Sequence, residues 1–347
     1  MADQTLLNVR DLAVSYAHKR QATAVRALHG VSFTVGQGET VAVVGESGTG
    51  KSTIAGAVLG LVPVAEGSIE YDHRDITYAS DSRRRSLCSE IQAVFQNPYS
   101  SFNPSRKIRD AVVEPLLYRS RQVRRDRDKA VAAMLQRVGL AADVASYYPR
   151  QLSGGQLQRI AIARALIASP RLVVLDEALS SLDLSVQAQI VNLLIELREE
   201  LGLAYLFIAH DLDIVKHLAH RVLVLYRGHV VESGPAGDIC DNPQHPYTRD
   251  LVSSVPVPDP LLQRQRRESR DGLRTAPPAI TSVSNDGCPF IARCASVAEI
   301  CASKPPPAAA GPHGSVVMCH RYPEPFITDP VGAENSVTSR DPRVFTD

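Results

Sequence analysis

An apolar run that leads directly into a glycine-rich octapeptide constrains the fold of this chain more than any other feature. Residues 39–45, ETVAVVG, form a near-continuous apolar segment, as expected for a strand that is covered on both faces. The octapeptide GESGTGKS follows from Gly45 to Ser52 and fits the pattern G-x-x-x-x-G-K-[ST], and helical spacing continues from Lys51 to about Leu61. This order is typical of a phosphate-binding loop, because glycine lets backbone N–H groups turn toward phosphate oxygens. The sequence therefore predicts an α/β fold built around such a loop.

The side chains of this loop have the chemistry that bound phosphates require. We expect Lys51 to reach the β- and γ-phosphates, Ser52 to ligate Mg²⁺, and the positive end of the helix to face the anion. A glycine-rich turn without a ligand is the alternative, since composition alone gives this pattern in roughly one chain per hundred of this size. The strand before the loop and the helix after it argue against that alternative. The candidate ligand-binding residues here are Gly45, Glu46, Ser47, Gly48, Thr49, Gly50, Lys51, Ser52 and Thr53.

Two carboxylates, Asp176 and Glu177, follow at the end of a second apolar strand, RLVVLD at 171–176. Such charges are costly beside an apolar strand unless they have a partner. We expect Asp176 to hold Mg²⁺ through water and Glu177 to polarise the water that attacks the terminal phosphate. A solvated pair at a strand end is the alternative, and the presence of a phosphate-binding loop argues against it.

Three further features bear on the kind of phosphate chemistry. LSGGQ, residues 152–156, precedes an apolar helix that ends by Pro170, and a serine and two glycines at a helix start can bind an anion. Gln96 lies in VFQNPYSSFNP, before a mostly helical stretch, and His210 directly follows the buried strand AYLFIA. Taken alone, Gln96 and His210 are more often loop residues that form hydrogen bonds than catalytic groups. Their order and their neighbours favour the catalytic interpretation.

Composition places the chain among ordinary globular proteins. Of its 347 residues, 44% are hydrophobic and 22% charged, far from the composition of a disordered chain. Lys and Arg number 38 and Asp and Glu 37, so the net charge of +1 creates no broad field for nucleic acid or anionic lipid. The sequence has no apolar run long enough to span a membrane and no N-terminal secretory signal, so we expect a protein of the cytosol.

With these motifs in this order, the sequence resembles the nucleotide-binding subunits of ATP-binding cassette (ABC) transporters over residues 1 to about 255. The resemblance implies that Tyr16 stacks on adenine, that Gln96 senses Mg²⁺ and contacts the membrane partner, and that His210 binds the γ-phosphate. It also identifies LSGGQ as the family's signature sequence and SSLD at 180–183 as the loop after the catalytic acid.

The resemblance further implies a head-to-tail dimer, in which Ser153 and Gly155 of one subunit cap the ATP that is bound to the other. The implied partners are two transmembrane permease subunits and a second ABC ATPase subunit, identical or homologous, at the cytoplasmic face of the cell membrane. The expected site residues outside the loop are Ser153, Gly154, Gly155, Gln156 and Asp183 for ATP, Glu177, His210 and Gln96 for catalysis, and Ser52, Gln96 and Asp176 for Mg²⁺.

Two regions are similar to the ATPases of oligopeptide and dipeptide (also nickel) importers: VFQNPYSSFNP with HPYTRDL at 245–251, and a C-terminal extension with GCPFIARC and VVMCHRY. This resemblance implies ATP-driven peptide uptake, with an extracytoplasmic peptide-binding protein in the complex. The transported molecule meets the permease and that protein, so this sequence does not specify it. A soluble ABC ATPase that works without a permease, in translation, DNA maintenance or phosphonate degradation, is the alternative.

Four of the six cysteines, Cys288, Cys294, Cys301 and Cys319, lie close together in the extension. Their gaps of five, six and seventeen residues do not fit the short pairs of zinc ribbons, whereas an iron–sulfur cluster accepts looser spacing. Free thiols in a loop-rich tail are the alternative. The resemblance to peptide importers favours a [4Fe–4S] cluster with a structural role.

Changes in composition along the chain predict its domain organisation. We expect a P-loop ABC ATPase core at 1–255, with a mixed sheet, a β-rich N-terminal subdomain and a helical subdomain at about 97–165. A Pro- and Arg-rich linker at 256–286 precedes the Cys-rich extension at 287–325, and a flexible tail is expected at 326–347.

Overall fold

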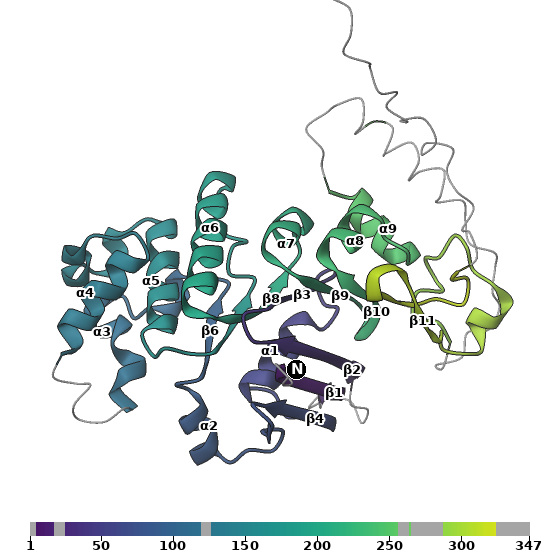
Figure 1. Cartoon of the computed structure of the whole chain (residues 1–347), viewed down its shortest axis with the longest axis horizontal. Coiled ribbons are helices and arrows are strands. Elements are labelled where there is room, and N and C mark those ends of the chain that lie inside the picture. Colours follow the sequence, from purple (N-terminus) through teal and green to yellow (C-terminus); the bar gives the residue numbers. More distant parts are fainter. Residues whose placement is uncertain (1–4, 17–24, 119–125, 256–263, 265–286, 324–347) are drawn as a thin grey trace, which may run out of the picture.

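The computed structural model describes residues 5–16, 25–118, 126–255, 264 and 287–323. Within these residues the strands form two sheets, which we call the main sheet and the side sheet. Most of the helices lie above or beside the main sheet in Figure 1, whereas the side sheet and two helices, Lys51–Leu59 and Asp81–Leu87, lie below it. Strands alternate with helices along the chain, so the predicted α/β class is confirmed.

The main sheet is parallel over most of its width. Its strands are β3 (Thr40–Val44), β6 (Ile91–Phe95), β7 (Leu172–Asp176), β8 (Ala204–Ala209), β9 (Arg221–Tyr226), β10 (His229–Pro235), β11 (Ala308–Ala310) and β12 (Val316–Met318). Their order is β11-β12-β10-β9-β3-β8-β7-β6, and the run from β9 to β6 is parallel. The carboxyl ends of these parallel strands therefore meet at one edge, where ligands bind in open α/β sheets.

The side sheet is antiparallel and belongs to the N-terminal part of the chain. Its strands are β1 (Thr5–Tyr16), β2 (Val25–Gly36), β4 (Glu66–Tyr71) and β5 (Arg74–Asp75). In the order β2-β1-β4-β5, Val9 of β1 pairs with Phe33 on one side and with Ile69 on the other. All three side chains are buried, so the side sheet has a face that packs onto the rest of the protein.

Alternate residues of the parallel strands supply two separate hydrophobic cores. Val41 and Val43 of β3 pack with α1 (Lys51–Leu59) and the side sheet, whereas Ala42 and Val44 pack with the helices on the opposite face. Burying one such valine contributes about 1.5–3 kcal/mol. Coverage on both faces explains why the strand reads as an unbroken apolar run.

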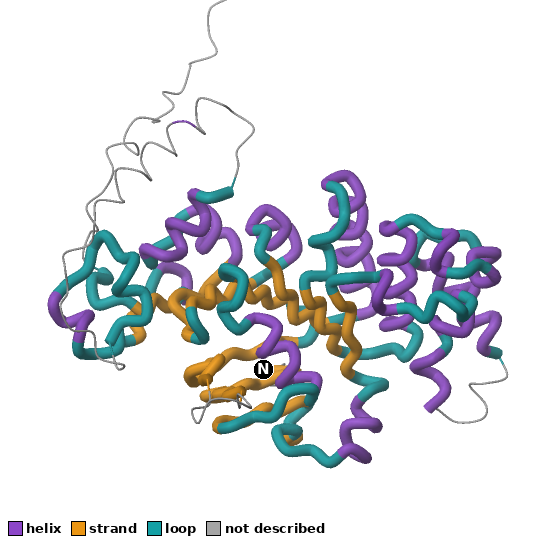
Figure 2. Tube along the Cα trace, turned by 180° about the vertical axis from the view of Figure 1, so that it is seen from behind, coloured by secondary structure: helices purple, strands orange, loops and turns teal. Residues whose placement is uncertain are grey.

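Eight further α-helices lie within the described residues, and all but α2 fall into two groups. They are α2 (Asp81–Leu87), α3 (Ile108–Val112), α4 (Arg127–Arg137), α5 (Gly154–Leu166), α6 (Leu184–Leu201), α7 (Leu212–Leu218), α8 (Ala236–Asp241) and α9 (Pro246–Ser253). Helices α3, α4 and α5 contact one another at one end of the molecule, within the stretch expected to be helical, while α6 to α9 line up along the main sheet (Figures 1 and 2). Helix α5 ends at Leu166, earlier than the expected stop at Pro170.

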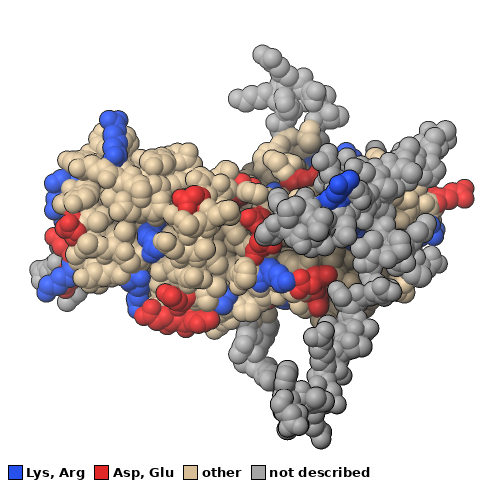
Figure 3. Space-filling model, turned by 90° about the horizontal axis from the view of Figure 1, so that it is seen from above, with Lys and Arg blue, Asp and Glu red and all other residues tan. Residues whose placement is uncertain are grey.

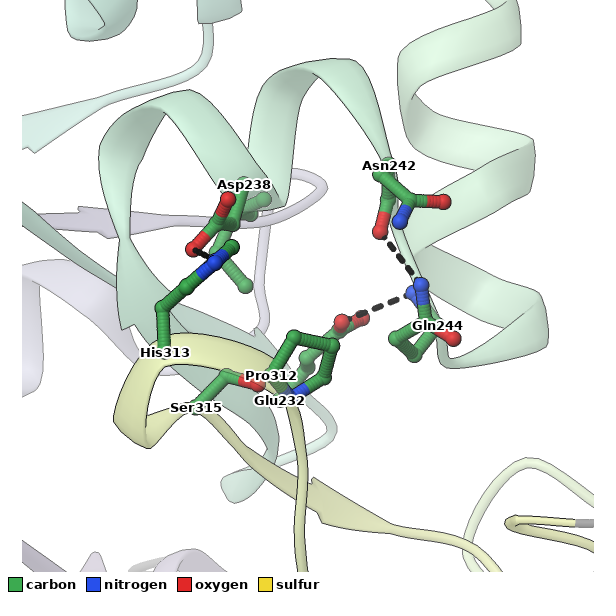
Figure 4. A pocket seen from close by; sticks show the side chains of 8 residues that line it. Glu232, Asp238, Asn242, Gln244, Pro312, His313 and Ser315 are labelled. Atoms are coloured by element: carbon green, nitrogen blue, oxygen red, sulfur yellow. Dashed lines mark hydrogen bonds and ion pairs between the residues drawn. The ribbon is translucent and has the colours of Figure 1, made fainter.

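The C-terminal extension joins the main sheet, which was not predicted from the sequence. Val317 of β12 pairs with Glu232 of β10, and β11, which follows three prolines at 305–307, pairs with β12. Figure 4 shows the neighbouring seam between the extension and α8, where His313 Nδ1 lies 2.9 Å from Asp238 Oδ2. The extension is therefore continuous with the cassette through backbone pairing as well as side-chain contacts.

The predicted linker, apart from Arg264, and the predicted tail lie outside the described residues. The domain boundaries stay predictions. Within the described part, the helices include none that is both long and apolar enough to cross a membrane. On the face shown in Figure 3, Lys and Arg side chains lie among Asp and Glu side chains rather than in one field of a single sign.

Candidate nucleotide-binding site

The predicted phosphate-binding loop connects β3 to α1, at the edge where the parallel strands end. Gly45, Gly48 and Gly50 have φ angles of 153°, 79° and 106°, in the region that favours glycine. A Cβ at Gly45 would also lie 2.3 Å from the carbonyl oxygen of Leu225. Backbone packing against β9 therefore requires a glycine at the first position of the loop.

Lys51 is enclosed by the loop that precedes it. Only 4% of its side chain is exposed, and Nζ donates hydrogen bonds of 2.9 Å to the carbonyl oxygens of Gly45 and Glu46. Burial lowers the pKa of Lys51, and the nearby charges of Glu177 and Asp176 oppose that effect. The ammonium group is thus held inside the loop and faces two carboxylates.

Ser52 and Asp176 come together from distant parts of the sequence. Ser52 Oγ donates a hydrogen bond of 3.0 Å to Asp176 Oδ1. Burial raises the pKa of Asp176, and the hydrogen bond from Ser52 opposes the rise. A hydroxyl and a carboxylate suit Mg²⁺, which takes oxygen ligands and usually binds through one or two protein groups together with phosphates and water. These two residues fit the expected ion.

Glu177 has the strained backbone often found at functional sites. Its φ angle is 48°, and its backbone N donates a 3.0 Å hydrogen bond to the carbonyl oxygen of Ile208. Gln96 Nε2 donates a 2.9 Å hydrogen bond to Glu177 Oε2, while Lys51 Nζ lies 3.9 Å from Oε1. The ends of β6 and β7 and the phosphate-binding loop thus converge on this one carboxylate.

His210 and Tyr16 complete the surroundings of the loop. His210 follows β8 and lines a cavity together with Glu177 and Ser180. Tyr16 ends β1, is 45% exposed, and its hydroxyl lies 3.1 Å from Thr53 Oγ1 at the start of α1. An aromatic ring is therefore available beside the loop.

The signature residues lie in the helical part of the molecule and cap their own helix. Ser153 Oγ accepts a hydrogen bond from the backbone N of Gln156, and Gln156 Oε1 accepts one from the backbone N of Ser153, which forms a capping box at α5. Gly155 packs against α6, where a Cβ would lie 2.7 Å from Val186 Cγ1. Asp183 caps α6 by accepting from the backbone N of Val186.

The four cysteines of the extension are near one another but are not arranged as a metal site. Burial raises the pKa of Cys288 to about 11 and that of Cys294 to about 12, and the charges of neighbouring cysteines add to both shifts. Cys288 N donates a 2.8 Å hydrogen bond to the carbonyl oxygen of Cys301. In the part of the chain that the structure describes, no group of three or more His, Cys, Asp or Glu side chains is placed to hold a metal ion. The expected iron–sulfur cluster is not supported by this geometry.

Two contacts to the loop were missed by the sequence analysis. The backbone N of Glu46 donates a 2.9 Å hydrogen bond to the hydroxyl of Tyr247, and Arg293 forms an ion pair with the Glu46 carboxylate. Tyr247 lies within the segment HPYTRDL, which was noted only for its resemblance to importers, and Arg293 lies in GCPFIARC. A conventional phosphate-loop pattern contains no signal for either residue, because both come from outside the loop.

Comparison with known proteins agrees with this arrangement. The family model for ABC transporters matches residues 28–180, and the model for the C-terminal region of oligopeptide/dipeptide transporters matches residues 231–301. The oligopeptide transport ATP-binding protein OppF of Salmonella typhimurium is 42% identical over 312 residues, which cover 87% of this chain and 92% of OppF. The di/tripeptide transport ATP-binding protein DppF of Pseudomonas aeruginosa is 42% identical over 309 residues, covering 87% of this chain and 94% of DppF.

Solved structures show the same fold. The dimeric post-hydrolysis state of the ATP-binding cassette MJ0796, bound to ADP and Pi, has a TM-score of 0.61 and 28% sequence identity, covering 67% of this chain and 99% of that one. The match to the oligopeptide/dipeptide C-terminal region favours an importer subunit over a soluble ABC ATPase that acts without a permease. The chain therefore belongs to the ABC transporter family, as an ATP-hydrolysing subunit of the oligopeptide/dipeptide importer group.

Proposed function

We propose that this chain binds ATP with Mg²⁺ at the phosphate-binding loop and uses its hydrolysis to drive the uptake of oligopeptides or dipeptides. The observation that carries this proposal is the convergence of Lys51, Gln96, Asp176 and Glu177 at the carboxyl edge of the main sheet. Phosphoryl transfer needs mainly positioning and charge neutralisation, and these residues supply both.

In the proposed site the loop and its lysine bind the phosphates. Lys51 exchanges its two carbonyl acceptors for phosphate oxygens. The backbone N–H groups of the loop donate hydrogen bonds to the other phosphate oxygens. Ser52 and Asp176 would hold Mg²⁺, and the ion would supply further neutralisation of phosphate charge. Tyr16 stacks on the adenine ring at the open side of α1.

Glu177 orients the attacking water in this proposal. The hydrogen bond from Gln96 turns the carboxylate toward the loop, and the Lys51 ammonium lies 3.9 Å from it. His210, which shares a cavity with Glu177, holds the γ-phosphate. Gln96, which donates to Glu177, would sense bound Mg²⁺ and relay occupancy of the site to the permease.

We further propose that the complete site needs a second ATPase subunit. Ser153, Gly154, Gly155 and Gln156 of one subunit, together with Asp183, cap the ATP of the other. This is supported by the capping box of α5, which presents a helix start suited to an anion. Two permease subunits and an extracytoplasmic peptide-binding protein complete the transporter, and the chain is bound peripherally at the cytoplasmic face of the membrane.

The test of the proposed function is Glu177→Gln, which keeps the shape of the side chain and removes its charge. We expect ATP binding to persist while hydrolysis falls by at least about a hundredfold, because the water loses its orienting carboxylate. Glu196→Gln, a matched change of an exposed glutamate on α6, should leave turnover unchanged. Normal turnover by the Glu177 variant would overturn the assigned role.

The extension carries a finer proposal, that Cys288, Cys294, Cys301 and Cys319 hold a structural [4Fe–4S] cluster. It is supported by the free state of all four thiols and by the backbone hydrogen bond that joins Cys288 to Cys301. Because they are not arranged as a metal site, the segment must close around the cluster. The test is the iron and sulfide content of anaerobically purified protein. The four Cys→Ser variants serve as controls, and absence of both elements from the parent protein would contradict the proposal.

A further inference from the structure

Glu46, the second residue of the phosphate-binding loop, is held through its main chain by three neighbours. Its backbone N donates to the hydroxyl of Tyr247, which is buried on α9, at 2.9 Å. Its carbonyl oxygen accepts 2.9 Å hydrogen bonds from Lys51 Nζ and from Thr49 Oγ1. The orientation of this peptide unit therefore affects the position of the lysine that binds phosphate.

The Glu46 side chain is bound by the C-terminal extension. Arg293 Nη1 donates to both carboxylate oxygens, at 2.9 Å to Oε1 and 2.8 Å to Oε2, across 247 residues of sequence. This hydrogen bonding raises the pKa of Arg293. The side chains of Arg293 and Glu46 are 42% and 46% exposed, so solvent reaches the pair and weakens its attraction.

Aromatic packing fixes the position of Arg293. Its guanidinium carbon lies 5.8 Å from the ring centre of Phe290 and 5.9 Å from the ring centres of Tyr226 and Tyr247. Phe290 is buried among these rings, and the backbone N of Arg293 donates a 3.0 Å hydrogen bond to its carbonyl oxygen. The arginine thus extends from a rigid part of the extension, and cation–π attraction adds to its placement.

The charge of Glu46 is unfavourable where a polyphosphate binds. A free carboxylate within the loop would repel a polyphosphate bound there, because charges closer than the screening length of physiological salt, about 8 Å, interact appreciably. The ion pair with Arg293 cancels the charge of Glu46. It also fixes the side chain of Glu46, whose carbonyl oxygen binds Lys51.

We propose that Arg293 is a positioning residue for ATP binding, which neutralises Glu46 and holds the phosphate-binding loop in its receptive form. The C-terminal extension is then a part of the nucleotide site and not only an addition to the sheet. This inference rests on the proposed function, because it assumes that the loop binds ATP.

The experiment compares five full-length variants with the parent protein: R293A, R293K, E46Q, the double variant R293A/E46Q, and H313A. The dissociation constant of a non-cleavable ATP analogue with Mg²⁺ is measured, together with KM and kcat for ATP. H313A is the matched control, since it removes a different contact between the extension and the cassette, the one with Asp238.

We expect R293A to raise the dissociation constant and KM by about threefold to tenfold, with a smaller change in kcat. The same substitution in the E46Q background should have an effect of less than about twofold, because no charge is left to neutralise. H313A should bind the analogue like the parent protein. R293K, which keeps the charge, should fall between R293A and the parent.

An unchanged dissociation constant in R293A would overturn the proposal. So would a rise of the dissociation constant on R293A that is as large in the E46Q background as in the parent protein. Thermal unfolding shows whether R293A has lost its structure in general. If it has, the dissociation constants of R293K and of the double variant decide whether Arg293 affects binding of the analogue. Complete failure of the parent chain to bind the analogue contradicts the proposed function instead.

Discussion

The hydroxyl of Ser52 lies 3.0 Å from Asp176 Oδ1, although 124 residues separate the two in sequence. The contact joins the first turn of α1 to the last residue of β7. It places a neutral and a charged oxygen side by side at the edge of the main sheet where the phosphate-binding loop opens.

Asp176→Asn should weaken the response to Mg²⁺. The amide keeps the shape of the side chain but loses the charge that faces the ion, and changes of this kind cost about tenfold to a hundredfold in metal affinity. The measurement is a Mg²⁺ titration of ATP hydrolysis at saturating ATP. An unaltered half-saturating Mg²⁺ concentration would exclude Asp176 from the metal site.

Tyr16 should contribute through its ring rather than through its hydroxyl. Tyr16→Phe removes only the 3.1 Å contact with Thr53, whereas Tyr16→Ala removes the surface on which a base can stack. Stacking on an aromatic residue is worth about 1–3 kcal/mol per base, so we expect the alanine variant to bind ATP roughly fivefold to a hundredfold more weakly. Equal affinities of the two variants would disprove adenine stacking at this position.

Gly155→Ala should destabilise the contact between α5 and α6. The added Cβ would lie 2.7 Å from Val186 Cγ1, and overpacking of this kind costs about 1–3 kcal/mol. The penalty should shrink in the Val186→Ala background, where the obstructing methyl groups are absent. Thermal unfolding of the two single variants and the double variant measures this, and a penalty of the same size in both backgrounds would refute the steric explanation.

His245 should make the protein sensitive to acid. Burial lowers the pKa of His245 to about 3, against about 6.5 in the unfolded chain, so between these values only the unfolded chain takes up the proton. The free energy of unfolding should therefore fall as the pH falls below 6.5, by about 1.4 kcal/mol per pH unit from this residue. His245→Asn keeps an acceptor for the backbone N of Tyr247 and should flatten the slope.

The control for this measurement is His217→Asn, which changes an exposed histidine on α7. Urea unfolding between pH 5 and 7 compares the slopes. If His245→Asn loses stability with acid as steeply as the parent protein, another group carries the proton uptake. His229 is such a group, because burial lowers its pKa to about 4.

Much of the catalytic cassette could be predicted from the sequence because its signals are local. The apolar run at 39–45 announces a strand buried on both faces, and the loop that follows has a spacing that only phosphate binding requires. The acids at the end of β7 are equally visible, since charge directly after an apolar strand needs a partner. The structure places Asp176 beside Ser52 and Glu177 beside Lys51.

The extension could not be predicted in the same way because its contacts are tertiary. Strands β11 and β12 have three residues each. That is too few to show the alternation of apolar and polar residues from which a strand is predicted. The pair of Arg293 with Glu46 depends on how the chain returns after 247 residues, and no local pattern encodes that return. The cysteines show a different limit: the resemblance to peptide importers favoured a cluster, and the described geometry does not assemble one.

The short strand β11 is the outermost strand at this end of the main sheet within the described residues. Three prolines at 305–307 precede it and the strand itself has only three residues, so it offers a strand from another molecule few N–H groups for pairing. Loss of the extension would instead leave β10 exposed as a template for intermolecular pairing. The segment that reaches the nucleotide loop therefore also covers the edge of β10 that would otherwise be open to pairing.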